Sequence, residues 1–182
     1  MTDDNIFHPF VPGKVKPPLR DEWAAARERI LFIDKGIDAA QFGAIAHTAA
    51  VVGITRIVVA ESALPALLCQ EAWTAAAGAL GTIKIYCAEN MRNALGMFSE
   101  RFFILGLVRE GGRRIEYGKP VVFPGKSVAL YLSGDKNGVP ADNISRCDYL
   151  LHIPEAAGTA FHYTPRELAA QILPWLYFKH KK

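Results

Sequence analysis

Short apolar runs alternate along the chain with longer segments in which apolar residues recur every three or four positions. An apolar run of about five residues without helical spacing is typical of a strand buried on both faces of a sheet. Such runs lie at Ile30–Asp34, Arg56–Ala60, Thr82–Cys87, Phe102–Val108, Val128–Leu132 and Tyr149–Ile153. The alternation predicts an α/β fold, a mostly parallel sheet with helices on both faces.

The segments between these runs predict the helices that cover the sheet. Apolar residues follow helical spacing in Ala39–Val52, and Gly53 is placed to end that helix. Ser62 is placed to cap a second helix that ends near Gly81. Further helices are predicted at Asn90–Phe98, at Pro140–Arg146 and from Thr164 onward.

The stretch Val128–Pro154 holds two apolar runs around a loop that contains Gly134 and Gly138. Asn137-Gly138 is a good hairpin-turn signal, which would pair the two runs directly. The intervening Pro140–Arg146, too long for a tight turn, favours strand–loop–helix–strand instead. Either glycine can adopt a positive φ or let another molecule approach the backbone closely.

Composition and charge narrow the classes of protein that fit. The chain has 182 residues, 51% of them hydrophobic and 21% charged, which predicts one compact domain with a sizeable core. No apolar run approaches the about 20 residues of a membrane span. Three scattered cysteines without a CxxC pair predict reduced thiols in a cytoplasmic protein. Five histidines without ligand spacing predict no metal site, and the net charge of +3 permits a polyanionic partner.

The first residues differ in composition from the rest. We predict that residues 1–28 form a proline-rich arm, with the basic residues Lys14, Lys16 and Arg20, and that residues 29–182 form the folded domain. The arm fits a disordered leader and an RNA-contacting segment about equally well. Within it, Asp21–Arg29 fits one short helix.

Ligands of open parallel sheets bind outside the carboxyl ends of the strands. The first loop at that edge reads DKGIDAAQFGA, and the chain contains no GxGxxG, GxxxxGK[ST] or GxSxG motif. A dinucleotide site, a P-loop and a hydrolase nucleophile are therefore not predicted. By elimination, the glycine loop at 134–138 and the loop after Pro154 are the candidate ligand-binding loops.

Three segments resemble the SpoU (TrmH-type) branch of the SPOUT RNA methyltransferases. Gln41–Ala60 is similar to the first motif, Asn-x-Gly-x-x-x-Arg-Thr-Ala followed by a Gly and a strand. Leu130–Pro154 is similar to the second, Gly-x-Glu-x-x-Gly followed by Cys-Asp and Ile-Pro. The closing LAAQIL resembles the family's alanine-rich last helix. The resemblance, from about Ile30 onward, implies a trefoil knot in the C-terminal part of the sheet.

The resemblance also implies a cofactor and the residues that hold it. The family binds S-adenosylmethionine largely through backbone groups of three loops. Carried over by position, these residues are Leu107, Gly134, Gly138, Ile153 and Pro154. Plain strand core is the alternative for Leu107 and Ile153, and a simple turn is the alternative for the two glycines.

The family's catalytic side chains are not retained. His47 stands where the family has its arginine, Gln41 stands where it has asparagine, and Tyr163-Thr164-Pro165 aligns with Ser-Leu-Asn. A neutral imidazole at His47 could serve as a base but cannot supply the permanent charge or fork of an arginine; the alternative is an ordinary helix histidine. Thr164–Glu167 is also a capping box with proline at the first helical position. His162 and Tyr163 either line the pocket or pack.

The function that the resemblance implies is S-adenosylmethionine-dependent methylation of a ribose 2′-hydroxyl in tRNA or rRNA. A catalytically degenerate SpoU-like RNA-binding or assembly protein is the second hypothesis, and a small-molecule α/β enzyme is the third. The family is dimeric through its knot helices, so a homodimer is expected. The apolar segment Ile172–Phe178 is a surface suited to such an interface. The basic arm and the loop Arg109–Lys119 are the expected RNA contacts.

Overall fold

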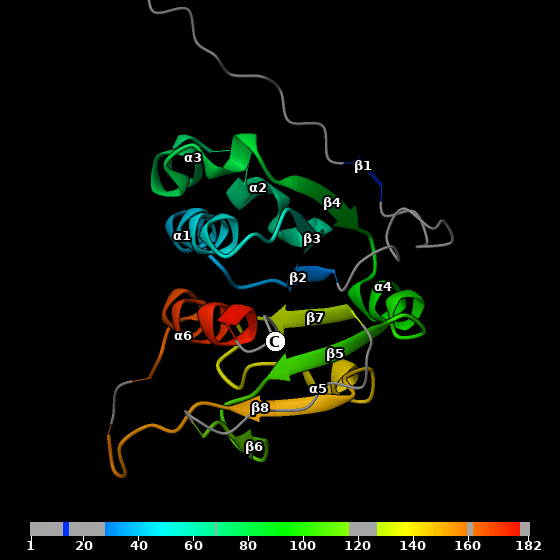
Figure 1. Ribbon diagram of the computed structural model, residues 1–182, viewed down its shortest axis with the longest axis vertical. Helices are drawn as coiled ribbons and strands as arrows, with labels where there is room; N and C mark the ends of the chain where they lie inside the picture. The colour runs from blue at the N-terminus through cyan, green and yellow to red at the C-terminus, as the bar shows by residue number, and fades with distance from the viewer. Residues whose placement is uncertain (1–12, 15–27, 68, 117–126, 160–161, 179–182) are drawn as a thin grey trace, which may run out of the picture.

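The computed structural model describes residues 13–14, 28–67, 69–116, 127–159 and 162–178. Eight strands of this described part form one sheet in the order β1-β4-β3-β2-β7-β5-β8-β6, and every strand pair is parallel (Figure 1). The strands are β1 Gly13–Lys14, β2 Arg29–Ile33, β3 Arg56–Ala60, β4 Lys84–Ala88, β5 Phe102–Leu107, β6 Arg113–Arg114, β7 Ser127–Leu132 and β8 Tyr149–His152.

Helices cover both faces of the sheet, as predicted. They are α1 Ala39–Val51, α2 Leu64–Leu67, α3 Gln70–Ala76, α4 Met91–Phe98, α5 Ala141–Ile144 and α6 Pro165–Phe178. Side chains alternate along each strand between two cores, so Leu31 and Ile33 of β2 pack on the side of α1, α3 and α6. Ile30 and Phe32 face α4 on the other side. The predicted α/β class is confirmed, whereas the trefoil knot stays a prediction.

The stretch Val128–Pro154 is a strand–loop–helix–strand unit and not a hairpin. β5 lies between β7 and β8 and pairs with both in parallel. The hairpin alternative is therefore wrong. Pro140 precedes α5 as its N-cap residue, with ψ at 142°, rather than occupying the first helical turn.

The single helix expected between Ser62 and Gly81 is wrong. The segment divides into a 3₁₀ turn at Glu61–Ala63, α2, α3 and a second 3₁₀ turn at Ala79–Gly81. Ala77 and Gly78 have φ values of 47° and 88°, a left-handed backbone that ends the right-handed α3. Apolar spacing alone did not reveal this interruption, because it continues across the break.

Two short strands lie in segments expected to be irregular. β1 belongs to the predicted arm and pairs with β4, while β6 lies in the predicted charged loop and pairs with β8. Two residues carry no periodicity, so the sequence pattern could not predict either strand. The helix expected at Asp21–Arg29 falls almost wholly outside the described residues, and its last residue, Arg29, begins β2. The arm–domain boundary stays a prediction.

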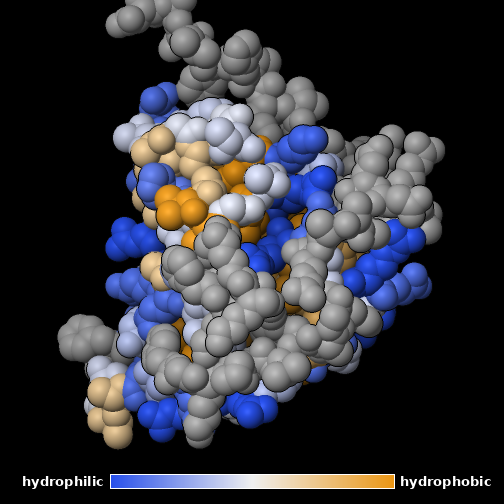
Figure 2. All heavy atoms as spheres, viewed as in Figure 1, coloured by the Kyte–Doolittle hydropathy of each residue, from blue (hydrophilic) through white to orange (hydrophobic). Residues whose placement is uncertain are grey.

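The described side chains of Ile172–Leu176 in α6 belong largely to the core, contrary to the expectation that this segment offers a free apolar surface. Ile172 and Leu173 are fully buried, and Trp175 and Leu176 are 9% and 3% exposed. The exposed large apolar side chains of the described residues are Val51 of α1, at 72%, and Ile144 of α5, at 40%, and apolar surface gathers over α1 in Figure 2. The homodimer stays a prediction. Within the described ranges no helix is both long and apolar enough to cross a membrane.

Candidate functional site

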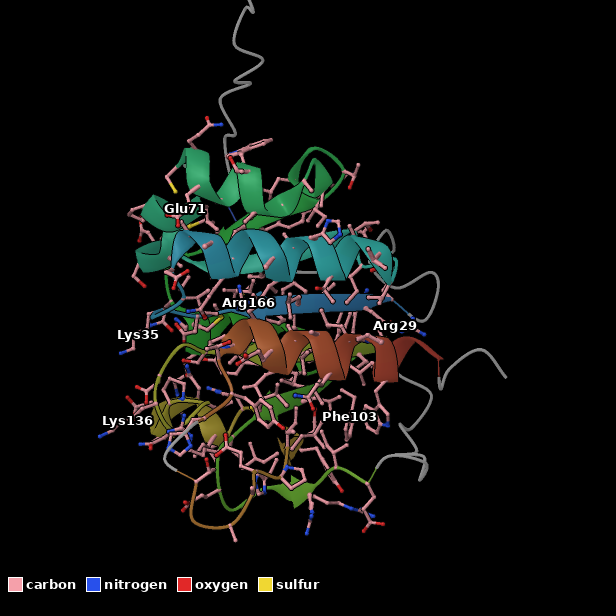
Figure 3. The ribbon with its side chains drawn as sticks, turned by 90° about the vertical axis from the view of Figure 1, so that its left-hand side faces the viewer. Arg29, Lys35, Glu71, Phe103, Lys136 and Arg166 are labelled. Carbon is pink, nitrogen blue, oxygen red and sulfur yellow. The ribbon has the colours of Figure 1, made fainter. Side chains whose placement is uncertain are left out.

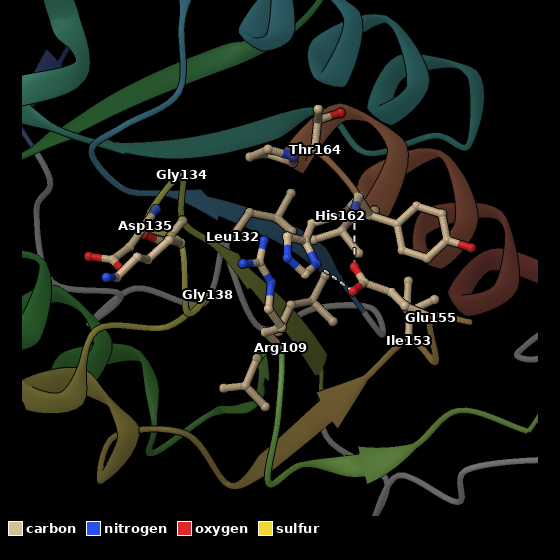
Figure 4. Close-up of a pocket in the computed structure, with 16 residues that line it drawn as sticks. Arg109, Leu132, Gly134, Asp135, Gly138, Ile153, Glu155, His162 and Thr164 are labelled. Carbon is tan, nitrogen blue, oxygen red and sulfur yellow. Dashed lines mark hydrogen bonds and ion pairs between the residues drawn. The ribbon is translucent and has the colours of Figure 1, made fainter. Parts of the chain in front are cut away.

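A cavity of about 240 Å³ opens where β5, β7 and β8 end and α6 begins (Figure 4). Its wall includes four aliphatic side chains, Leu107, Leu132, Ile153 and Leu168. Its polar residues include Arg109, Asp135, Lys136, Glu155 and His162. An apolar wall with a few polar and charged groups is typical of a site for a small molecule. No cluster of three metal-ligating side chains occurs among the described residues.

Gly134 and Gly138 both lie in the cavity lining, yet the chain's own packing already requires them. A methyl group added to Gly134 would collide with the carbonyl group of Gly36, because the loops after β7 and β2 cross there. Gly138 has a φ of 82°, and a methyl group there would collide with the carbonyl oxygen of Leu107. A turn accounts for Gly138 and close packing against Gly36 accounts for Gly134, and their cofactor role stays a prediction.

Leu107 and Ile153 belong to the core and to the cavity wall at the same time. They are 3% and 5% exposed, and both line the cavity. Their two alternative roles, strand core and ligand contact, therefore do not exclude each other. Pro154 is half-buried beside Ile153 but is not among the lining residues. The structure brings together four of the five predicted cofactor residues.

Two residues at altered positions of the first motif, His47 and Gln41, make contacts with the helices α1 and α3 and their ends. The Nδ1 atom of His47 lies 3.2 Å from the carbonyl oxygen of Ala76, and the side chain is otherwise exposed on α1. Gln41 Nε2 donates to Asp38 Oδ2 at 2.7 Å. Neither residue is among those that line the cavity. The catalytic role of His47 stays a prediction.

Glu155 and His162 line the cavity and are joined by a side-chain hydrogen bond, and the sequence analysis overlooked Glu155. The Nδ1 atom of His162 lies 2.7 Å from Glu155 Oε2, and the backbone N–H of Tyr163 donates to Oε1 at 3.0 Å. The hydrogen bond from His162 is the largest cause that lowers the pKa of Glu155, and Arg109 contributes in the same direction. The available signal was an acidic residue directly after Ile-Pro.

A buried polar network joins the ends of β2 and β7 beneath the site. The hydroxyl of Tyr131 donates to Asp34 Oδ2, and Asn143 Nδ2 donates to the Tyr131 oxygen at 2.7 Å. Burial, followed by the hydrogen bond to Asp34, raises the pKa of Tyr131 well above its usual range. No sequence pattern indicated this network, because Tyr131 lies in an otherwise apolar run.

A sequence model of the SpoU rRNA methylase family matches residues 28–160, which is most of the chain. The chain belongs to this family. The match covers the three strands that end at the cavity and the loops after β5 and β7, and it ends at residue 160, within the loop after β8. No curated protein matches the sequence.

Solved structures similar to this SpoU family member share its fold. A TrmH-family RNA methyltransferase structure from Porphyromonas gingivalis has a TM-score of 0.72 at 18% identity, covering 90% of this chain and 61% of its own. AviRb from Streptomyces viridochromogenes, a SpoU methyltransferase solved with S-adenosylmethionine, has a TM-score of 0.71 at 17% identity, covering 89% and 63%. A TrmH/SpoU tRNA-modifying enzyme from A. aeolicus has 0.69 at 17%, covering 86% and 77%. The chain thus spans somewhat less than two thirds of the first two proteins.

Proposed function

We propose that this SpoU family member is a methyltransferase that binds S-adenosylmethionine in the cavity at the ends of β5, β7 and β8. The observation that carries the proposal is the convergence of these three loops on one cavity with an aliphatic wall and charged polar residues. AviRb, which has the same fold, was solved with this cofactor. When bound, the cofactor supplies an electrophilic methyl group.

The residues present suit the parts of this cofactor. Its adenine is flat and apolar on both faces, and Leu107, Ile153 and Leu168 offer aliphatic contact. Its sulfonium and its amino-acid end carry charges of both signs, and the cavity has the carboxylates of Asp135 and Glu155 as well as the cations Arg109 and Lys136. The chain's contribution is to hold and orient the cofactor with preformed loops.

We propose a ribose 2′-hydroxyl of tRNA or rRNA as the methyl acceptor. The family is described as one of rRNA methylases, and the A. aeolicus relative as a tRNA-modifying enzyme. The side chains of Lys35, Lys136 and Arg166 gather at the same edge of the molecule, beside the loops that form the cavity (Figure 3). Exposed cations at this edge are suited to hold the phosphates that flank a reacting nucleotide.

A catalytically degenerate RNA-binding member is a second candidate function. It is favoured by the position of His47, which contacts Ala76 and is not among the lining residues of the cavity. In that case the protein would bind the cofactor or RNA without transferring a methyl group. The two candidate functions therefore differ in one measurable step, the transfer of the methyl group to RNA.

Calorimetry with S-adenosylmethionine and transfer of labelled methyl to bulk RNA test these proposals together. We expect saturable cofactor binding that Leu168→Trp weakens at least tenfold, because the larger indole occupies part of the cavity. Ala170→Trp, on an exposed position of the same helix, is the matched control and should bind normally. Thermal unfolding of both variants checks that they are folded.

The outcomes separate the candidates. Absence of cofactor binding at millimolar concentration would overturn the methyltransferase proposal. Binding without transfer to any RNA would favour the degenerate member. Binding with transfer would establish the enzyme and leave the modified nucleotide to be mapped.

A further inference from the structure

We infer that His162, oriented by Glu155, is the base that takes the proton of the ribose hydroxyl during methyl transfer. The inference rests on the proposed function and adds the residue that replaces the missing catalytic side chains. It assigns His162 a catalytic role and Glu155 a positioning role. His47, which aligns with the family's arginine, is the competing candidate.

The contacts of Glu155 fix both its position and the form of the histidine. Its Oε2 lies 2.7 Å from His162 Nδ1, and its Oε1 accepts the Tyr163 N–H at 3.0 Å, so both carboxylate oxygens are held. A carboxylate can only accept, so the neutral imidazole donates through Nδ1–H. The lone pair is then on Nε2, the nitrogen that a general base uses when a carboxylate holds the other one.

Both residues lie in the cavity proposed for the cofactor. Figure 4 shows the hydrogen-bonded pair among the lining residues that follow β5, β7 and β8. The Glu155 side chain is 19% exposed, whereas that of His162 is 42% exposed, so the pair combines a shielded anchor with an accessible imidazole. The lowered pKa of Glu155 keeps the anchor ionised at neutral pH. His47, in contrast, contacts Ala76 on the helical layer.

The proposed step balances without any further reactant. The ribose oxygen forms a bond to the methyl carbon of the sulfonium as the carbon–sulfur bond breaks. The electron pair of that bond stays on sulfur, which becomes a neutral thioether. The hydroxyl proton passes to Nε2 of His162, and the resulting imidazolium is stabilised by the carboxylate of Glu155. Bulk water then removes the proton.

Other charged groups share the cavity and will influence this proton transfer. They come from each loop that meets there: Arg109 after β5, Asp135 and Lys136 after β7, and Glu155 and Tyr163 on the loop that carries His162. Because charges of both signs are present, the pH dependence must be assigned by substitution and not from the wild-type profile alone.

His162→Gln tests the base directly. We expect the variant to bind the cofactor with an affinity within about threefold of wild type. Its single-turnover methyl-transfer rate should be lower by about 10²–10⁴-fold, which is the rate enhancement that a general base usually contributes. His152→Gln, a half-buried histidine of β8 that is not among the lining residues, is the matched control and should retain the wild-type rate. An unchanged rate in His162→Gln, or its loss in His47→Gln alone, would overturn the inference.

Glu155 variants distinguish positioning from simple support of the loop. The wild-type rate should rise with pH and then level off, as for any reaction that needs a deprotonated base. Glu155→Gln should displace this rise along the pH axis as well as reduce the plateau, because the amide no longer stabilises the imidazolium. Glu155→Asp should restore part of the plateau. A rate loss at every pH with an unmoved profile would show a merely structural residue and overturn the positioning role.

The tautomer of His162 gives a readout that does not depend on activity. Long-range ¹H–¹⁵N correlation spectra of the unliganded protein at pH 8 should show a protonated Nδ1 and an unprotonated Nε2. The opposite tautomer would overturn the inference even if the methyltransferase proposal holds. The expected tautomer together with failed cofactor binding would instead locate the failure in the proposed function.

Discussion

Tyr131 is a polar residue in the middle of an apolar strand, and its hydroxyl is fully used. It donates to the buried carboxylate of Asp34 and accepts from Asn143 Nδ2. Asp34, which is 6% exposed, also accepts the backbone N–H of Lys35 at 2.8 Å. This network therefore ties β7, α5 and the loop after β2 together at the carboxyl edge of the sheet.

Replacing Tyr131 with Phe should destabilise the protein by about 1–3 kcal/mol, because Asp34 then keeps a buried oxygen without its donor. Chemical denaturation, followed by circular dichroism, measures the loss. Asp34→Asn and the double variant complete a double-mutant cycle. If the two residues act as a pair, the sum of the stability losses in the two single variants should exceed the loss in the double variant. Additive losses, or a loss below about 0.5 kcal/mol, would contradict this account.

At the level of single residues, the sequence predicted which positions matter better than why they matter. Gly134 and Gly138 were selected for a positive φ or for close approach by another molecule, whereas the structure shows close approach by the chain itself. The approaching atoms belong to Gly36 and Leu107, which lie far away in the chain. Glu155 was missed because its partner, His162, becomes a neighbour only when the loop folds back.

Among the elements, the buried strands were predictable and the short edge strands were not. An apolar run of about five residues signals burial on both faces, which holds for the inner strands β2, β3, β5 and β7. β1 and β6 are held by pairing with β4 and β8 and have no internal signal. The capping box at Thr164–Glu167 is confirmed, with Thr164 N donating to Glu167 Oε2 at 2.7 Å and Pro165 beginning α6.

The start of α1 explains the altered residue of the first motif in structural terms. Asp38 caps the helix through Oδ1, which accepts the Gln41 N–H at 2.8 Å, while Oδ2 accepts Gln41 Nε2 at 2.7 Å. The longer side chain at position 41 thus reaches back to the cap. Gln41 therefore has a local structural role, which is to hold the capping carboxylate of Asp38 at the start of α1.

Asp38→Ala should cost about 0.5–2 kcal/mol of stability, the usual range for loss of an N-cap side chain. Asp38→Asn keeps an acceptor for the same N–H and should cost much less, so it is the matched control. Both values come from urea denaturation at pH 7. Equal losses for the two variants would mean that the charge of Asp38, and not its cap hydrogen bond, stabilises α1.

At the scale of the whole molecule, the sheet topology creates the candidate site. The loops after β5, β7 and β8 are separated along the chain, yet the strand order β7-β5-β8 makes them neighbours at one edge. Parallel pairing then places all their carboxyl ends together. Strand prediction identified the loops but could not give their order in the sheet. The family resemblance implied that three of them hold one cofactor, and the structure shows the cavity that these loops share.

The same edge carries the cations that we expect to meet RNA. Lys35 follows β2, Lys136 follows β7 and Arg166 lies at the start of α6, and all three side chains are exposed. Replacing each with Ala should weaken RNA binding by a similar factor for different sequences, because phosphate contacts carry no sequence information. The slope of log K against log salt concentration should fall by about one for each lost contact.

Filter binding or fluorescence anisotropy at several salt concentrations measures both effects on one RNA. Lys84→Ala is the matched control: Lys84 is also exposed, but it begins β4 and therefore lies at the amino edge of the parallel sheet. If Lys84→Ala lowers affinity and slope as much as the other three variants, the positive charge acts as a diffuse field and not as a defined edge. If only the three cavity-side variants respond, RNA lies across the carboxyl edge, where its ribose can reach the proposed cofactor cavity and His162.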